Sequence, residues 1–311
     1  MKLNSLRLAL MVMLLVLFGA LGTVWAANSQ QESSPHLTPD KWIGQSFTFL
    51  SLPAADQAAG YEIFDVELAK QGFNGDHSAR IPYAQNVSKQ VTVTDVVTYI
   101  ASDNQYEYII YLEENESKQK LVGRTSRGQL EGLVLTSDLA KAQKQFLGKT
   151  VYVKLRTIEG LYDPQTITKP LSIPTKIGSA VNVVDVYAGM KSSEPIWLIV
   201  VTDNQKAFIP ITYSLTNVPS NFCQQDPPWQ EKVMLNDFRA TSGWSEELWN
   251  QIDAGIVNLG MTSEQVRFSW GAPASISQHA TDPNVSIWKY GTKTLNFSGD
   301  KLTSIESEVT P

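Results

Sequence analysis

The sequence predicts a multidomain chain in which two tandem small all-β barrels are followed by an α+β domain. The middle of the chain repeats one order of short β-branched segments, and the last third carries helix caps followed by a hairpin pattern. The single cysteine, Cys223, cannot form an internal disulfide, so stability has to come from apolar cores. We divide the chain into residues 1–26 (signal peptide), 27–39 (flexible tether), 40–143 and 144–218 (first and second barrel repeats), 219–244 (linker) and 245–311 (α+β domain).

The N-terminus has the pattern of an export signal. Lys2 and Arg7 precede an apolar run over residues 8–21, and residues 24–26 (Val-Trp-Ala) place small side chains where a signal peptidase reads them. Cleavage after residue 26 takes away two cations and no acids, which brings the formal net charge from −6 to −8. The alternative is an uncleaved anchor, because about 20 uncharged residues can cross a bilayer. An acidic mature chain disfavours a nucleic-acid partner and a polybasic contact with anionic lipid.

The Ser-, Gln- and Pro-rich residues 27–39 predict a flexible tether, and the body that follows repeats itself. Each unit has about five short alternating runs divided by turn residues, which predicts a small barrel similar to bacterial SH3-like barrels. We also expect a helix over residues 54–71 and a connecting helix over residues 138–146. The corresponding segments are 44–50 and 148–154, 81–82 and 173–174, 91–96 and 181–186, and 108–115 and 197–204.

Residues 260–273 carry the strongest local signals. Thr262 and Gln265 form a capping-box pattern, and Gly271 supplies the positive φ that ends a helix. Ser245 predicts the start of an earlier helix. Strands follow over residues 274–278, 285–290, 294–298 and 301–307, with a two-residue turn at Gly299-Asp300. The predicted order is therefore two helices and then a three- to four-stranded antiparallel sheet.

At these residues the chain resembles a known family, the small α+β domain of the outer-membrane assembly lipoprotein BamE, also called SmpA or OmlA. The resemblance covers residues 245–311 and implies a Gram-negative envelope protein, periplasmic or outer-membrane-associated, that works with the assembly machinery or with peptidoglycan-associated structures. The family is anchored through a lipidated cysteine just after its signal peptide, and this chain has no lipobox cysteine there. The matching residues are Gly260-Met261-Thr262, Glu264-Gln265-Val266, Gly271, Pro273, Trp288, Tyr290, Leu295 and Phe297.

Fragments that imitate catalytic or metal-binding motifs lack the required context. Gly148-Lys149-Thr150 ends like a phosphate-binding loop, but residue 143 is Gln where that loop needs glycine. His36, His77 and His279 lie apart, with no second histidine at metal-binding spacing. No acid, base and nucleophile converge, so we predict no catalytic residues, no metal and no cofactor, and no enzyme activity.

An acidic run at Glu113, Glu114 and Glu116 has two interpretations. It fits the solvated tip of a hairpin, and it also supplies the carboxylates that a calcium site requires.

Tryptophans concentrate in the last third of the chain, at positions 229, 244, 249, 270 and 288. Core packing in the small domain is one explanation. The other is a partner-binding patch at Trp229 and Trp244, which lie in a Pro- and Gly-containing stretch and are our candidate protein-interaction residues.

These observations predict an exported, non-enzymatic cell-envelope protein that acts as a protein-interaction scaffold in outer-membrane protein assembly or envelope integrity. A protein that binds peptidoglycan through its barrels is one alternative. An inhibitor of a periplasmic enzyme is another.

Overall fold

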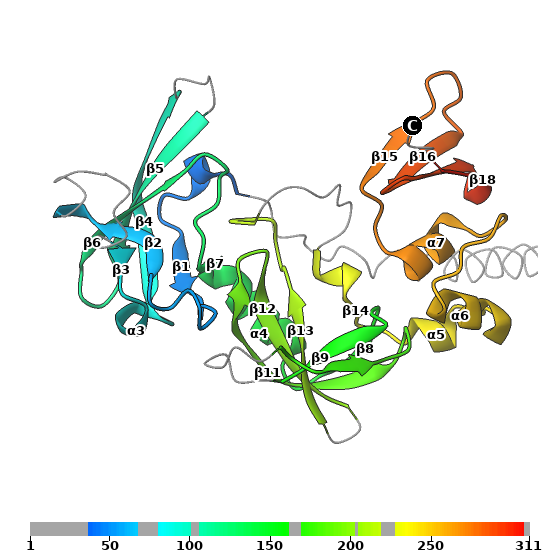
Figure 1. Cartoon of the computed structure of the whole chain (residues 1–311), viewed down its shortest axis with the longest axis horizontal. Coiled ribbons are helices and arrows are strands. Elements are labelled where there is room, and N and C mark those ends of the chain that lie inside the picture. Colours follow the sequence, from blue (N-terminus) through cyan, green and yellow to red (C-terminus); the bar gives the residue numbers. More distant parts are fainter. Residues whose placement is uncertain are drawn as a thin grey trace, which may run out of the picture. The chain divides into compact units, whose positions relative to one another are not determined.

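The structure, a computed structural model, describes residues 37–67, 80–100, 106–161, 169–202, 205–218 and 228–307. Within these ranges the chain is mostly β-structure, with two curled seven-stranded sheets and a smaller four-stranded sheet accompanied by helices (Figure 1). The signal peptide, His36, His77 and Cys223 lie outside the described residues. No helix among those described is long and apolar enough to cross a membrane.

The first sheet, which we call module 1, has the strand order β3-β2-β6-β5-β4-β1-β7. Its strands are β1 (Ser46–Phe49), β2 (Tyr61–Asp65), β3 (Arg80–Ile81), β4 (Gln90–Ile100), β5 (Tyr106–Glu114), β6 (Lys120–Thr125) and β7 (Leu133–Leu135), with η1 (Pro39–Lys41) and α3 (Tyr83–Asn86) as its short helices.

The second sheet, module 2, has the order β10-β9-β13-β12-β11-β8-β14, which is the order of module 1 strand for strand. The tandem repeat in the sequence therefore corresponds to two sheets of one topology. The strands are β8 (Thr150–Val153), β9 (Thr157–Gly160), β10 (Ser172–Pro174), β11 (Ala180–Lys191), β12 (Glu194–Thr202), β13 (Gln205–Ile211) and β14 (Val233–Met234).

The two modules also share a local irregularity at one position of the repeat. The pairing of β4 with β5 shifts register between Val93 and Asp95, and that of β11 with β12 shifts between Val183 and Asp185. Each aspartate accepts a hydrogen bond of 2.8 Å from the next backbone amide. Because a bulge bends and twists its strand, the shared bulge curls both sheets in the same way.

Helix α4 (Thr136–Phe146) joins the modules and confirms the predicted connecting helix. It buries Ala142 and Phe146 in the core of module 2, which also takes Leu50 and Val134 from module 1. A shared core fastens the modules to each other more firmly than a flexible linker would.

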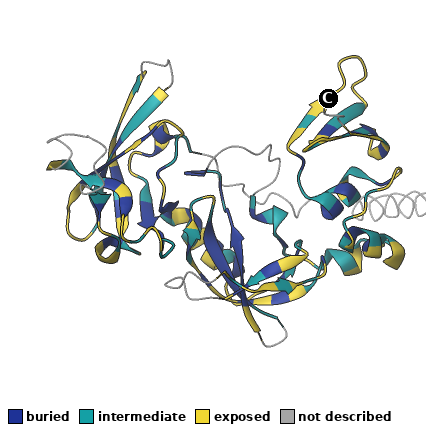
Figure 2. Ribbon diagram, viewed as in Figure 1, coloured by how far each residue is buried: buried dark blue, intermediate teal, exposed yellow. Residues whose placement is uncertain are grey.

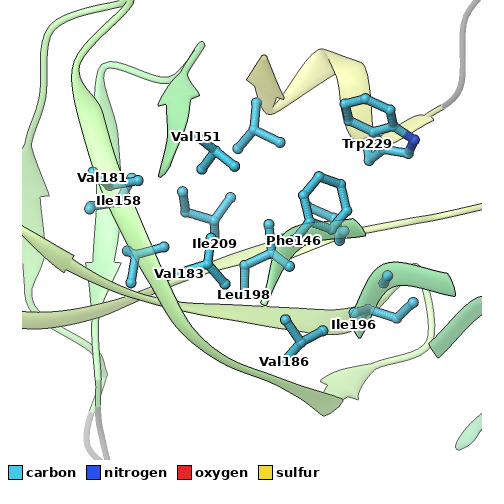
Figure 3. Packing of buried hydrophobic residues seen from close by; sticks show 14 of the residues in the cluster. Phe146, Val151, Ile158, Val181, Val183, Val186, Ile196, Leu198, Ile209 and Trp229 are labelled. Carbon is cyan, nitrogen blue, oxygen red and sulfur yellow. The ribbon is translucent and has the colours of Figure 1, made fainter. Parts of the chain in front are cut away.

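Residues 228–234, which the sequence places in a linker, belong to module 2 in the structure. Helix η3 (Pro228–Glu231) carries Trp229 into the same core, edge-on to Phe146 at 5.2 Å between ring centroids (Figure 3). Strand β14 then pairs with β8 and completes the sheet.

Module 2 is covered on both faces of its central strands. Consecutive residues of β12 and β13 are buried, whereas β15 is largely exposed (Figure 2). Successive side chains of a strand point to opposite faces, so unbroken burial means that neither face is free. Trp197 and Phe208 stack at 4.0 Å and, with Ile199, form a cluster separate from the main core.

The C-terminal domain follows the predicted order closely. Thr262 and Gln265 form the capping box in both directions, Ser245 caps the earlier helix, and Gly271 has φ +77°. Gly299 and Asp300 connect the last two strands of a simple antiparallel sheet, β15-β16-β17-β18. The elements are α5 (Phe238–Thr241), which lies in the segment predicted to be a linker, α6 (Glu246–Asp253), α7 (Ser263–Trp270), β15 (Ser275–Gln278), β16 (Val285–Tyr290), β17 (Lys293–Ser298) and β18 (Lys301–Ser307).

The helix predicted over residues 54–71 is wrong for residues 54–59, which form turns, and for residues 61–65, which form strand β2. Residues 68–71 of this prediction lie outside the described residues. Gly60 adopts φ +73° and ends the alanine-rich stretch that suggested a helix. Tyr61 and Ile63 then alternate into the core of module 1 while β2 pairs with β3 and β6. Pairing with distant strands outweighs the local helix propensity of this segment.

Candidate functional site

The structure does not bring the two tryptophans that we singled out together on a surface. Trp229 is 3% exposed and lies in the core of module 2. Trp244 is half-buried among Phe238, Trp249 and Phe268, at ring distances of 5.0–5.3 Å. Trp229 is therefore a packing residue, out of reach of a partner, and Trp244 gives most of its surface to a second aromatic cluster.

One cavity lies between module 1 and the turn that joins β11 to β12 of module 2. It measures about 500 Å³ and we call it the groove. Module 1 contributes seven residues between Leu52 and Glu62, together with Arg80, Gln129, Glu131 and Gly132, and module 2 contributes residues 190–193. The amide of Gly132 donates a 2.9 Å hydrogen bond to Oγ of Ser192, which ties the two walls together.

Glycine is required where the groove wall turns. A β-carbon at Gly60 would stand 2.3 Å from the carbonyl oxygen of Ile81, and one at Gly132 would stand 2.8 Å from the ring of Tyr61. The Tyr61 hydroxyl donates to the carbonyl of Leu50, and burial raises the pKa of this phenol, so it stays protonated and keeps donating. These close contacts give the wall one packed conformation.

Some charged side chains of the groove form ion pairs with a described residue, and two carboxylates do not. Arg80 forms a 2.9 Å ion pair with Glu62, and Lys191 lies 4.0 Å from Glu159. Asp56 and Glu131 also line the groove, both are exposed, and within the described ranges neither has a cation at ion-pair distance. The groove therefore offers two uncompensated carboxylates to whatever enters it.

A buried side chain at the end of module 2 holds one wall of the groove in place. Asn217, which is 1% exposed, donates from Nδ2 to the carbonyls of Leu130 and Leu133 at 2.9 and 2.7 Å. Its Oδ1 accepts from the amide of Leu130 at 2.7 Å. The segment before it is fixed as well, because Oδ2 of Asp138 on α4 accepts from the hydroxyl and the amide of Ser214. Burial raises the pKa of the Asp138 carboxyl.

The acidic run at residues 113–116 is not a set of three free carboxylates. Glu114 is 1% exposed and accepts hydrogen bonds from the amides of its own turn, and Glu113 lies 3.5 Å from Lys118. Among the residues that the structure describes, no three acidic, histidine or cysteine side chains gather as a metal site would require. His279, the one histidine in the described ranges, is exposed and interacts with Thr281.

The lining of the groove combines carboxylates, hydroxyls, the cations of Arg80 and Lys191, and apolar side chains that include Leu52 and Met190. Sequence reasoning missed them because Asp56, Glu131 and Ser192 are far apart along the chain and belong to no spaced motif. Comparison with protein-family models, with curated proteins and with solved structures gives no match to this chain.

Proposed function

We propose that this chain is an exported, non-enzymatic scaffold of the Gram-negative cell envelope, periplasmic or outer-membrane-associated, that binds segments of other proteins. In this proposal the modules are SH3-like barrels and residues 245–311 form a BamE-like domain. The work of the scaffold is outer-membrane protein assembly or envelope integrity. The resemblance quoted above supports the compartment, and the groove supports binding.

The observation that carries the proposal is the groove itself. Two modules build it, its walls are tied by hydrogen bonds, and Asp56 and Glu131 lack ion-pair partners among the described residues. A cleft of mixed apolar and polar lining with surplus negative charge fits an extended polypeptide segment that carries lysine or arginine.

The test is photo-crosslinking in the native envelope from a photoreactive residue at Ser193, an exposed groove residue. We expect capture of an envelope protein through a segment that contains basic residues. Reversing both groove charges, Asp56→Lys with Glu131→Lys, should lower the yield about fivefold or more, because each exposed ion pair contributes up to about 1 kcal/mol.

The matched control reverses two exposed acids outside the groove, Glu116→Lys with Asp282→Lys. If the groove variant captures as much protein as this control, the groove is not the binding site. Capture of muropeptide in place of protein would favour the peptidoglycan-binding alternative.

A further inference from the structure

A second cavity of about 450 Å³ lies where module 2 meets the C-terminal domain. It is lined by Arg156, Gly255, Ser269, Trp270, Tyr290 and Lys293, and we call it the Trp270 pocket. The set contains two cations and two aromatic rings but no carboxylate.

Arg156 fixes one wall of this pocket. Its Nη2 donates to the carbonyls of Ile252 and Ser269, the latter at 2.6 Å, and its Nε donates to the carbonyl of Asp253 at 2.8 Å. These carbonyls belong to the last turns of α6 and α7, where helix carbonyls lack intrahelical partners. Guanidinium carries five donors, so the two N–H groups of Nη1 keep no acceptor among the described residues.

The aromatic wall is equally fixed. Trp270 Nε1 donates to the carbonyl of Gly255 at 2.8 Å, and the Tyr290 hydroxyl donates to the carbonyl of Gly271 at 2.9 Å. The two rings meet edge to face at 5.4 Å, and Lys293 Nζ lies 4.8 Å from the centroid of Trp270. The polar atoms of both rings are used within the protein, so apolar ring surface and the Lys293 side chain remain to line the pocket.

The charge balance limits what the pocket can hold. Each helix C-terminus carries about half a negative charge, so α6 and α7 together offset about one of the two cations. The neighbouring pair of Arg267 and Glu231 is neutral as a unit. The surplus is therefore about one positive charge, which suits one carboxylate and not a polyanion such as a nucleic acid.

We propose that the Trp270 pocket binds one carboxylate of a partner polypeptide, held by Lys293 and Nη1 of Arg156, with the adjoining apolar atoms against Trp270 and Tyr290. The carboxylate comes either from an acidic side chain or from a chain end. The choice of a polypeptide rests on the proposed scaffold function, but the pocket shares no lining residue with the groove.

The experiment titrates the full chain with three short peptides and follows the indole ¹⁵N–H signal of Trp270, assigned with a Trp270→Phe sample among the eight tryptophans. One peptide has a glutamate side chain as its only carboxylate, one has only a free chain end, and one is fully amidated and uses glutamine. We expect a saturable shift from one or both carboxylate peptides and none from the amidated peptide, and the responding peptide identifies the source.

Lys293→Glu should weaken the binding that responds by roughly fivefold or more, since an exposed attractive pair becomes a repulsive one. Lys301→Glu is the control, because Lys301 is an exposed lysine of the same sheet outside the pocket. The proposal is overturned if neither carboxylate peptide binds, if the amidated peptide binds equally, or if Lys293→Glu binds as the control does. Crosslinking from the groove tests a different site, so the proposal for the Trp270 pocket can be wrong while the proposed function of the groove is right, and the reverse.

Discussion

Replacing Glu114 by glutamine should loosen the turn between β5 and β6. Oε1 of Glu114 accepts from the amide of Glu116 at 3.0 Å, and Oε2 accepts from the amide of Ser117 at 2.7 Å. Lys89 Nζ adds a weak ion pair at 3.9 Å. Hydrogen bonds from Ser117 and from the Glu116 amide, with the charge of Lys89, lower the pKa of Glu114 from the usual 4.5 to about 2.

The size of the effect follows from that displacement of the pKa. A change from 4.5 to about 2 corresponds to at most about 3 kcal/mol of stabilisation by the ionised form. Glutamine keeps one of the two acceptors, so we expect a loss of about 1.5 kcal/mol, roughly half of that limit, at pH 7. Because the pKa is lowered in the folded state, the stabilisation is present above pH 4.5 and is lost as the pH falls through about 2.

Hydrogen exchange, measured by mass spectrometry on peptides covering β5 and β6, reports the stability of this turn locally. A local measurement is needed because a chain with two modules and a C-terminal domain need not unfold in one step. Protection in the Glu114→Gln variant should fall at pH 7, and the difference from the parent should shrink towards pH 2. Glu116→Gln is the control, because Glu116 is exposed in the same turn and its side chain accepts no hydrogen bond from the described residues. Equal protection in Glu114→Gln and Glu116→Gln at pH 7 would refute the reasoning.

Three further substitutions test the packing that the groove and the C-terminal domain depend on. Gly60→Ala should destabilise module 1 by about 2 kcal/mol or more, because the added β-carbon clashes with Ile81 and alanine disfavours the positive φ. Gly44→Ala is the control: its β-carbon meets no atom within 4 Å, so only the positive φ should cost about 1 kcal/mol. Urea unfolding of the two variants measures the difference. Thr262→Ala removes the capping box and should lower the stability of the C-terminal domain by about 1 kcal/mol, while Thr262→Ser should restore it, as measured by exchange of the α7 amides. Asn217→Ala leaves three buried backbone groups of Leu130 and Leu133 without their hydrogen-bond partner and should cost about 3 kcal/mol. The loss should appear as faster hydrogen exchange of the backbone amides of residues 129–135. Full protection of these amides in the variant would contradict this account.

The C-terminal domain was largely predictable because its signals are local. A capping box, a helix-ending glycine and a two-residue hairpin turn each act within a few residues, so α7, β16 and β18 begin and end within about one residue of the prediction. The repeat was visible for a related reason. The bulge at Asp95 and Asp185 recurs with a valine two residues before and a valine one residue after the aspartate in both modules.

The structural features that could not be predicted from the sequence depend on contacts between distant segments. Residues 61–65 became strand β2 through pairing with β3 and β6, and Trp229 became a core residue because β14 adds to the edge of module 2. The groove is the extreme case. Its carboxylates are 75 positions apart in the sequence, at Asp56 and Glu131. The folding of module 1 brings them to one wall, and the β11–β12 turn of module 2 forms the other wall.

The two modules share a topology but differ on the outer face of the sheet, and this difference bears on how a scaffold is built. Register places Ile109 of module 1 and Trp197 of module 2 at equivalent positions, each two residues from the partner of its bulge aspartate. The predicted correspondence of residues 108–115 with 197–204 is therefore wrong by one residue. Trp197 is 2% exposed and stacks on Phe208, whereas Ile109 is half-buried.

Module 2 thus uses both faces of β12 and β13 for packing, and β12 begins at the end of the β11–β12 turn. That turn reaches Gly132 of module 1, and Asn217 holds the neighbouring Leu130 and Leu133. A groove whose walls are ordered in advance loses little conformational entropy when a segment enters. Its affinity then depends on charge and shape at Asp56 and Glu131, which is why charge reversal there is the sharpest probe of the proposed function.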